Sequence, residues 1–204
     1  QVRGTNGSAN CWITYRLLDS PKSLTPEMVR LYNRGSYRRI REEYADALLD
    51  FSALLLLDPN HAEGLWERGI CNHELRNYHE AIEDYSKSIE LGTDESNIFY
   101  CRGLSHAELG EHQKAIENYS EAIKRDLENA DAYTDRGLSY DELGEHQKAI
   151  GDYLEAIRIQ PDHPRASDYL EDQIRHLNSW SGPIELLGSF VTDHGNVTRY
   201  RFES

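Results

Sequence analysis

A strictly periodic residue pattern constrains the fold of this chain more than any other feature. Four Arg-Gly dipeptides recur at one fixed interval, at 34–35, 68–69, 102–103 and 136–137. Twelve residues after each glycine stands an alanine, and sixteen residues after it an aromatic side chain: Phe51, Tyr85, Tyr119 and Tyr153. A fixed period of this length predicts stacked units that bury apolar surface against their neighbours, rather than one closed domain.

Each unit is expected to contain two helices. In the fourth unit, the apolar spacing predicts helices over 130–143 and 146–159, with Gly144 in a left-handed turn between them. Gly137 and Ala149 are expected where the two helices cross, because small side chains allow close approach. The third and fourth units also share the segment Leu-Gly-Glu-His-Gln-Lys-Ala-Ile, which indicates duplication within the chain. We place the four units at 28–61, 62–95, 96–129 and 130–163.

The glycine, alanine, aromatic and terminal proline positions resemble the tetratricopeptide repeat (TPR) family over residues 28–163. The resemblance implies an all-α fold, a right-handed TPR solenoid of helix-turn-helix repeats. Glu42 stands where the family commonly has glycine, so the turn inside the first unit is expected to be irregular. A second departure is the recurring arginine, in a slot where the family often has leucine: Arg34, Arg68, Arg102 and Arg136.

That recurring arginine has a recurring potential partner. Fifteen residues after each glycine stands an acidic or amide side chain: Asp50, Asp84, Asn118 and Asp152. In an antiparallel helix pair these positions can face each other, and a half-buried bond would satisfy both groups and set the helix register. A ligand-binding role for the arginines is the alternative.

The chain after the repeats changes character. Residues 164–178 predict one more amphipathic helix, which would cap the last exposed face of the array. Residues 179–183 are expected to form a linker. Ile184–Thr192 and Val197–Phe202 predict short strands around a hairpin turn, so residues 179–204 form a linker and a β-hairpin.

The N-terminal extension, residues 1–27, contains one further predicted strand, Cys11–Leu18. A lone hairpin is marginal in water, so the terminal strands are expected to pair with each other, with another chain or with the solenoid surface. Four stacked layers separate the two ends of the array. Pairing between two molecules, and hence a homodimer, is therefore the natural expectation for Cys11–Leu18.

Composition argues against several classes of partner. Lys plus Arg number 22 and Asp plus Glu number 36, so the net charge is −14, which disfavours nucleic acid and anionic lipid. The longest apolar run has five residues, 53–57, too short to cross a membrane. The three cysteines fit no disulfide or zinc spacing, so a reducing, cytoplasmic compartment is expected. Three Asn-X-Ser/Thr sequons point the other way, and we interpret them as chance matches.

No catalytic, metal or cofactor site is predicted. The chain has nine histidines, but His112 and His146 occupy one slot of duplicated units and the others lack the spacing of a helical ligand pair. Cys101 has no base and no orienting group beside it in the sequence pattern. No glycine-rich phosphate loop is present. We therefore expect that the protein is not an enzyme.

The TPR resemblance implies that partners lie along the concave surface of the first helices. Carried over slot by slot, the predicted partner-binding residues are Tyr32, Glu63, Trp66, Glu67, Asn97, Tyr100, Asp131 and Asp135. Aromatic side chains flanked by carboxylates predict a basic or neutral protein segment as the partner. The alternative is that the aromatic residues pack between repeats and the acids only keep the chain soluble.

One TPR subfamily binds acidic chaperone C-termini through a Lys/Asn/Arg carboxylate clamp. In this chain neither register of the clamp slots offers a cation, so clamp-type binding is not expected. The sequence thus predicts a non-catalytic protein-interaction adaptor. The alternative is a structural subunit of a larger assembly, or a homodimer, attached through its terminal strands.

Overall fold

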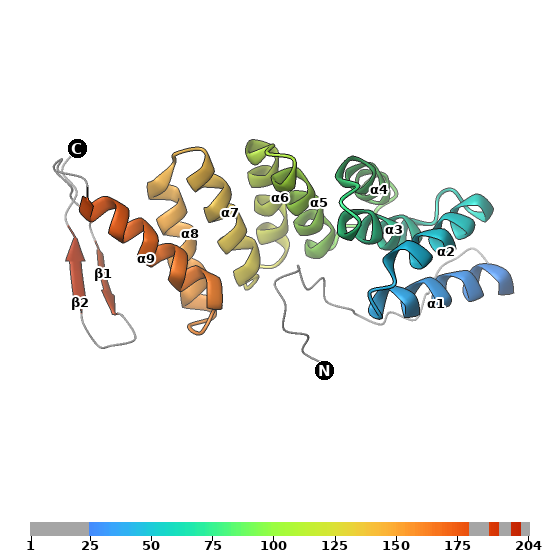
Figure 1. Ribbon diagram of the computed structural model, residues 1–204, viewed down its shortest axis with the longest axis horizontal. Coiled ribbons are helices and arrows are strands. Elements are labelled where there is room, and N and C mark those ends of the chain that lie inside the picture. Colours follow the sequence, from blue (N-terminus) through green and yellow to red (C-terminus); the bar gives the residue numbers. More distant parts are fainter. Residues whose placement is uncertain (1–24, 180–187, 192–196, 201–204) are drawn as a thin grey trace.

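The computed structural model describes residues 25–179, 188–191 and 197–200. Its helices follow one another in pairs along an elongated array, and two short strands come last (Figure 1). The helices of the described residues are α1 (Pro26–Ile40), α2 (Tyr44–Leu57), α3 (Ala62–Glu74), α4 (Tyr78–Glu90), α5 (Ser96–Glu108), α6 (His112–Arg125), α7 (Ala130–Glu142), α8 (His146–Ile159) and α9 (Pro164–Ser179).

Each pair is held together where a glycine of the first helix meets an aromatic ring of the second. A Cβ atom added at Gly69 would lie 2.6 Å from the Tyr85 ring, and one added at Gly137 would lie 2.7 Å from the Tyr153 ring. These two tyrosines are almost completely buried. Only hydrogen fits at the glycine positions, which explains the close approach predicted at the crossing of the fourth pair.

The predicted arginine register is confirmed in all four pairs. Arg68 donates hydrogen bonds of 2.9 and 2.6 Å to the carboxylate of Asp84, and Arg102 donates one of 2.6 Å to the side-chain oxygen of Asn118. Equivalent bonds join the residues of the two outer pairs: Arg34 to Asp50 and Arg136 to Asp152. The bonds join the two helices of one unit, which is the structural role predicted for these arginines.

The expectation of an irregular turn in the first unit is wrong. Glu42 takes a left-handed backbone conformation, with φ 62°, in the slot where Gly110 has φ 72° and Gly144 has φ 74°. Arg76, with φ 63°, does the same in the second unit. The residue after each of these donates the same closing bond, for example from Glu43 N to Arg38 O at 2.9 Å. The closing bonds and the packed helix pair therefore outweigh the strain of a side chain at this position.

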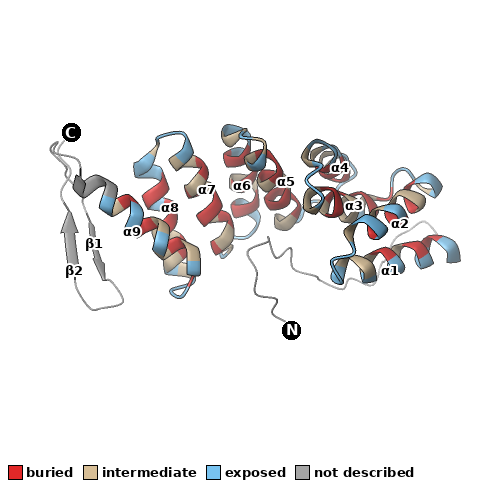
Figure 2. Cartoon of the chain, in the orientation of Figure 1, coloured by how far each residue is buried: buried red, intermediate tan, exposed pale blue. Residues whose placement is uncertain are grey.

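The array bends toward its first helices. Helix α1 contacts α3, α3 contacts α5, α5 contacts α7 and α7 contacts α9, whereas the second helices make no such contacts with one another in the described residues. The first helices are therefore closer together and lie on the inner side of the curve. Figure 2 shows that buried residues run along the facing sides of the helices, and exposed ones gather at the turns and outer sides.

Helix α9 and the two strands follow the last pair. Leu170 of α9 is buried against α8, and the Tyr169 ring stacks on that of Tyr153 at 5.6 Å. Strands β1 (Gly188–Val191) and β2 (Val197–Tyr200) pair antiparallel, with Gly188 opposite Tyr200. They lie inside the two segments for which the sequence predicts strands. The turn between them and the predicted strand Cys11–Leu18 fall outside the described residues.

Candidate binding surface on the first helices

We use the name inner surface for the face formed by α1, α3, α5 and α7. All of the predicted partner-binding residues lie on these helices. The structure separates them into two groups, those bonded between repeats and those still accessible. The residues are Tyr32 on α1, Glu63, Trp66 and Glu67 on α3, Asn97 and Tyr100 on α5, and Asp131 and Asp135 on α7.

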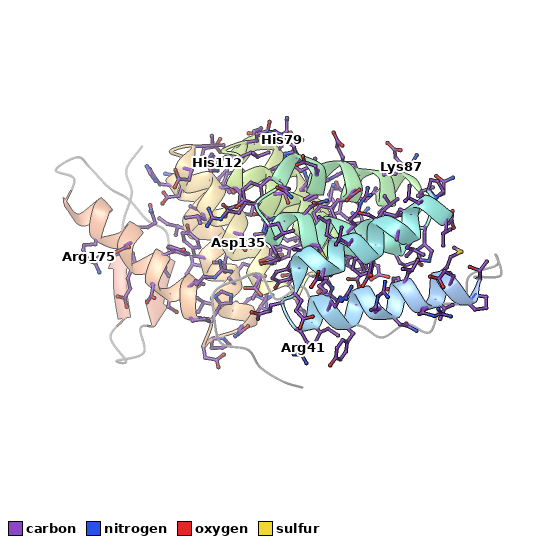
Figure 3. All side chains as sticks on the ribbon, turned by 45° about the vertical axis from the view of Figure 1, so that its right-hand side comes forward. Arg41, His79, Lys87, His112, Asp135 and Arg175 are labelled. Carbon is purple, nitrogen blue, oxygen red and sulfur yellow. The ribbon has the colours of Figure 1, made fainter. Side chains whose placement is uncertain are left out.

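Asp135 is the centre of a buried polar network. Tyr100 Oη donates a 2.6 Å hydrogen bond to Oδ2 of Asp135, and Arg165 Nη1 donates one of 2.7 Å to Oδ1. Arg165, from the start of α9, also reaches Asp131 at 3.0 Å. Asp135 and Tyr100 are each only 5% exposed. In Figure 3, Asp135 lies among the helices, whereas Lys87 and Arg175 lie at the periphery.

The ionisation of this network follows from its burial. Desolvation, together with the nearby charge of Asp135, raises the pKa of Tyr100 well above its ordinary value, so the phenol stays protonated and donates. Burial by itself would lower the pKa of Arg165. The charge of Asp135 and the hydrogen bonds between Arg165 and Asp135 outweigh burial, so the pKa lies above its ordinary value. Burial also raises the pKa of Asp135, while the charge of Arg165 and the hydrogen bonds from Tyr100 and Arg165 oppose that shift, so the carboxylate relies on these two partners.

Glu67, in the first half of the array, also forms a largely buried ion pair with an arginine of this chain. Its carboxylate accepts a hydrogen bond from Arg39 Nε, and the two side chains are 15% and 10% exposed. Glu67 and Asp135, both predicted as partner-binding residues, are therefore largely buried and already paired with arginines of this chain. Arg39 lies on α1 and Arg165 on α9, so each arginine belongs to a helix next to that of its carboxylate, outside the slots compared for partner binding. One signal was available, because Arg165 stands 34 residues after Asp131 and continues its slot.

The three predicted aromatic residues differ in exposure. Tyr100 is part of the hydrophobic core, which agrees with packing between repeats and not with an open anchor. Trp66 is half-buried against the same core, and its indole nitrogen is buried without a hydrogen-bond partner in the described part of the chain. Tyr32 is also half-buried, with its ring 6.0 Å from that of Phe51. Tyr32 and Trp66 therefore present the aromatic area that remains accessible.

The accessible polar groups of the inner surface lie near the starts of the first helices. The side chains of Glu63 and Asp131 are 48% and 47% exposed, and Asn97 is half-exposed. Hydrogen bonds from His163 and Arg165 lower the pKa of Asp131, although burial opposes them. Such carboxylates can accept hydrogen bonds from ammonium or guanidinium groups of a partner.

Several histidines have structural partners. His61 Nδ1 accepts a 3.0 Å hydrogen bond from the backbone nitrogen of Gly64, and His163 Nδ1 accepts one of 3.2 Å from that of Ala166, so both cap a helix start. Within residues 25–179 and the two strands, no group of three metal-ligating side chains comes together. The helices described here include none with the length and apolar character needed to cross a membrane.

Comparisons with known proteins give a consistent result. A family model described as tetratricopeptide repeat matches residues 32–96 and 100–164, more than half of the chain. A crystal structure of MamA is 30% identical, with TM-score 0.67, over 71% of this chain and 84% of that one. No curated protein matches the chain.

Two solved structures with lower sequence identity resemble this chain in fold only. MamA from Desulfovibrio magneticus RS-1 is 18% identical with TM-score 0.65, over 78% of this chain and all of that one. The first TPR of Spaghetti (RPAP3), bound to the HSP90 peptide SRMEEVD, is 22% identical with TM-score 0.55, over 57% of this chain and 93% of that one. With its period, its helix pairs and its family match, this chain belongs to the tetratricopeptide repeat family.

Proposed function

We propose that this protein is a non-catalytic adaptor whose inner surface binds a basic or neutral segment of a partner protein. The TPR fold commonly mediates protein–protein interaction. The preference for basic segments is supported by contacts that the chain makes with its own arginines. Acidic side chains of the inner surface already hold two guanidinium groups, those of Arg39 and Arg165.

The proposed contact residues follow from accessibility. Tyr32 and Trp66 supply half-buried aromatic area, and Glu63, Asn97 and Asp131 supply the polar contacts around it. Buried aromatic area anchors a partner, while carboxylates at the rim select for charge and speed the encounter. Glu67, Tyr100 and Asp135, also predicted as contacts, hold the first helices in place beneath that surface.

The peptide bound in the Spaghetti complex, SRMEEVD, has acidic residues toward its end. An acidic segment bound here would face Glu63 and Asp131, and like charges at an interface oppose binding. We therefore propose that the surface rejects acidic termini and accepts segments that contain Arg or Lys.

Peptide binding tests this proposal. Three fluorescent peptides of one length, with Arg, Ser or Glu at alternate positions, are titrated by anisotropy against the full chain. We expect the affinity to fall from the Arg to the Glu peptide, and the affinity for the Arg peptide to fall as salt rises. Glu63→Lys should weaken the Arg peptide by about fivefold, or roughly 1 kcal/mol, as expected for a rim charge.

Glu80→Lys is the matched control, because Glu80 is exposed on the second helix α4 and the substitution changes the net charge equally. We expect Glu80→Lys to leave the affinity for the Arg peptide within twofold of the wild-type value, roughly the limit of a non-local charge effect. Equal weakening by both substitutions, or preferential binding of the Glu peptide, would contradict the proposal.

The layout that we propose for the chain has four repeats, at 28–61, 62–95, 96–129 and 130–163, followed by α9 as a cap. Leu170 and Tyr169 cover the outer side of α8, while Glu171 and Asp172 of the same helix are exposed. A helix with one apolar and one polar face is what the end of a repeat array requires.

Attachment to a larger assembly, or a homodimer through the terminal strands, is the second candidate function. The observation that favours it is the sheet, which has only the two strands β1 and β2 in the described residues. The outer edges of so small a sheet can accept a further strand. Removal of residues 183–204 should then abolish assembly in sedimentation experiments while peptide binding persists. Unchanged assembly after the truncation would rule out this second function.

A further inference from the structure

The outer face of α2 is unusually apolar. Leu49 and Leu56 lie on this helix with 67% and 85% of their surface exposed. They are seven residues apart, so they stand two turns apart on one side of the helix. Exposed leucines are common singly, but a stripe on one helix face marks a surface that another element covers.

The other repeats provide an internal comparison for these two positions. The slot of Leu49 holds a glutamate in two units and a glycine in the last: Glu83, Glu117 and Gly151. The slot of Leu56 holds a charged residue in every later unit: Glu90, Lys124 and Arg158. All of these residues are exposed. Packing of the repeat therefore does not require leucine at either position, and α2 differs from α4, α6 and α8 for another reason.

The described chain begins at the end of the first helix pair where α2 carries Leu56. Arg34 bonds to Asp50, and Arg38 reaches the backbone oxygen of Asp46, so α1 and α2 run antiparallel. The start of α1 therefore lies beside the end of α2, and Met28 joins the same hydrophobic cluster as Leu54. Figure 1 shows the two helix ends together at one extremity of the array. Thr25, where the described chain begins, thus lies at the end of α2 that carries Leu56, although Leu56 itself points away from α1.

The segment upstream has the composition that such a face needs. Residues 11–18, Cys-Trp-Ile-Thr-Tyr-Arg-Leu-Leu, are mostly apolar and lie outside the described residues. Residues 19–24 connect them to α1, and six residues can span about 20 Å when extended, roughly the length of α2. A tether this short gives an effective concentration of about millimolar, which favours binding within the chain over binding between chains.

We propose that residues 11–18 bind the outer face of α2, over Leu49 and Leu56, within the same molecule. The docked segment would add a layer to the outer side of the first helix pair, on α2. It would also cover apolar surface that otherwise promotes association between molecules. This interaction is separate from the inner surface, since α2 is a second helix on the outer side of the curve.

Trp12 reports directly on this interaction. The chain has three tryptophans, and in a full-length Trp66→Phe, Trp180→Phe background tryptophan emission, excited selectively over tyrosine, comes from Trp12 alone. We expect blue-shifted emission and protection from acrylamide quenching. Leu49→Glu with Leu56→Lys, which copies the residues found in α6, should shift the emission to the red and raise quenching to that of a free peptide of residues 11–18.

Leu127→Lys is the control, because Leu127 is 65% exposed in the loop between α6 and α7, far along the chain from α2. It should leave the Trp12 emission unchanged, and circular dichroism should confirm the helix content of every variant. Solvent-exposed Trp12 emission before the α2 substitutions, or protected emission that survives them, would overturn the proposal. Protection that disappears on dilution together with a dimer in sedimentation would overturn it too, because a second copy would then cover the face.

Discussion

Tyr100 and Asp135 are joined by a 2.6 Å hydrogen bond that links α5 to α7, 35 residues apart in the sequence. Both residues stand where a partner-binding surface is expected, and the structure uses both to connect consecutive repeats. A buried carboxylate with a tyrosine donor and an arginine beside it is held by the fold itself. Changes at these positions should therefore affect the stability of the array before they affect binding.

Asp135→Lys should destabilise the protein strongly. The substitution removes the acceptor of Tyr100 and places a second cation beside Arg165 at a buried position. Breaking a buried pair in this way costs about 3–5 kcal/mol. Urea unfolding measures the loss, and Glu142→Lys, at an exposed position of the same helix, should stay within about 0.5 kcal/mol of the wild type. Equal stability of the two variants would show that Asp135 is not buried in solution.

Removing one arginine from the recurring pairs should cost more than removing a whole pair. Arg68→Leu leaves the buried carboxylate of Asp84 with only the amide of Asn72, and we expect a loss of about 2–4 kcal/mol. The double variant Arg68→Leu, Asp84→Leu should recover part of that loss, because no charge is left unpaired. Chemical denaturation of the wild type, Arg68→Leu, Asp84→Leu and the double variant gives the coupling energy. A double variant with the sum of the two single losses would refute the coupling.

Glycine should stabilise the first two turns. Glu42 and Arg76 are left-handed, a conformation that costs a side chain about 1–2 kcal/mol and glycine almost nothing. Because glycine also loses more entropy on folding, the net gain for Glu42→Gly or Arg76→Gly should be about 0.5–1 kcal/mol. Glu43→Gly, at a neighbouring position with negative φ, is the control and should give no gain. Thermal unfolding measures all three, and a loss for Glu42→Gly would contradict the prediction.

The contribution of the buried histidines to stability should fall as the pH drops below about 6.5, the ordinary histidine pKa. Burial lowers the pKa of His73, whose Nδ1 lies 2.9 Å from Ser105 Oγ, and burial also lowers that of His106 although Glu111 opposes it. The unfolded chain then binds more protons than the folded one between the two pKa values. The contribution is therefore complete above pH 6.5 and is lost as pH falls toward the folded-state pKa.

His73→Gln tests the pH effect, since glutamine can still bond to Ser105 but does not titrate in this range. Its free energy of unfolding, measured by urea between pH 7.5 and 5.5, should depend less on pH than that of the wild type. His79→Gln, at an exposed position, should keep the wild-type slope. Identical slopes for the wild type and His73→Gln would exclude His73 as the source.

The sequence predicts contacts within a unit well, because such contacts recur with the period. The bond of Arg136 to Asp152 appears four times at one spacing, so each copy supports the others. The close approach at Gly137 follows from the same recurrence. The helices predicted for the fourth unit, 130–143 and 146–159, match α7 and α8 to within one residue.

Contacts that occur once are not predictable in this way. Arg39 bonds to Glu67, and Arg165 to Asp135, but neither pair recurs in the other units. Whether a carboxylate on a first helix is exposed therefore depends on which side chain of a neighbouring helix lies beside it. The turn at Glu42 was mispredicted for an energetic reason: a strain of about 1–2 kcal/mol is small beside the packing of a helix pair.

Two of the recurring arginines, Arg102 and Arg136, also bond to the unit that precedes their own. Arg102 Nη1 donates to Ser86 Oγ at 3.1 Å, and Arg136 Nη1 donates to Ser120 Oγ at 3.0 Å. Both partners recur with the period of the array, so an additional copy of the third unit would find suitable partners on each side. An ancestral gene could lengthen by tandem duplication without a new junction having to evolve. The shared segment of the third and fourth units is the trace that such growth leaves in a sequence.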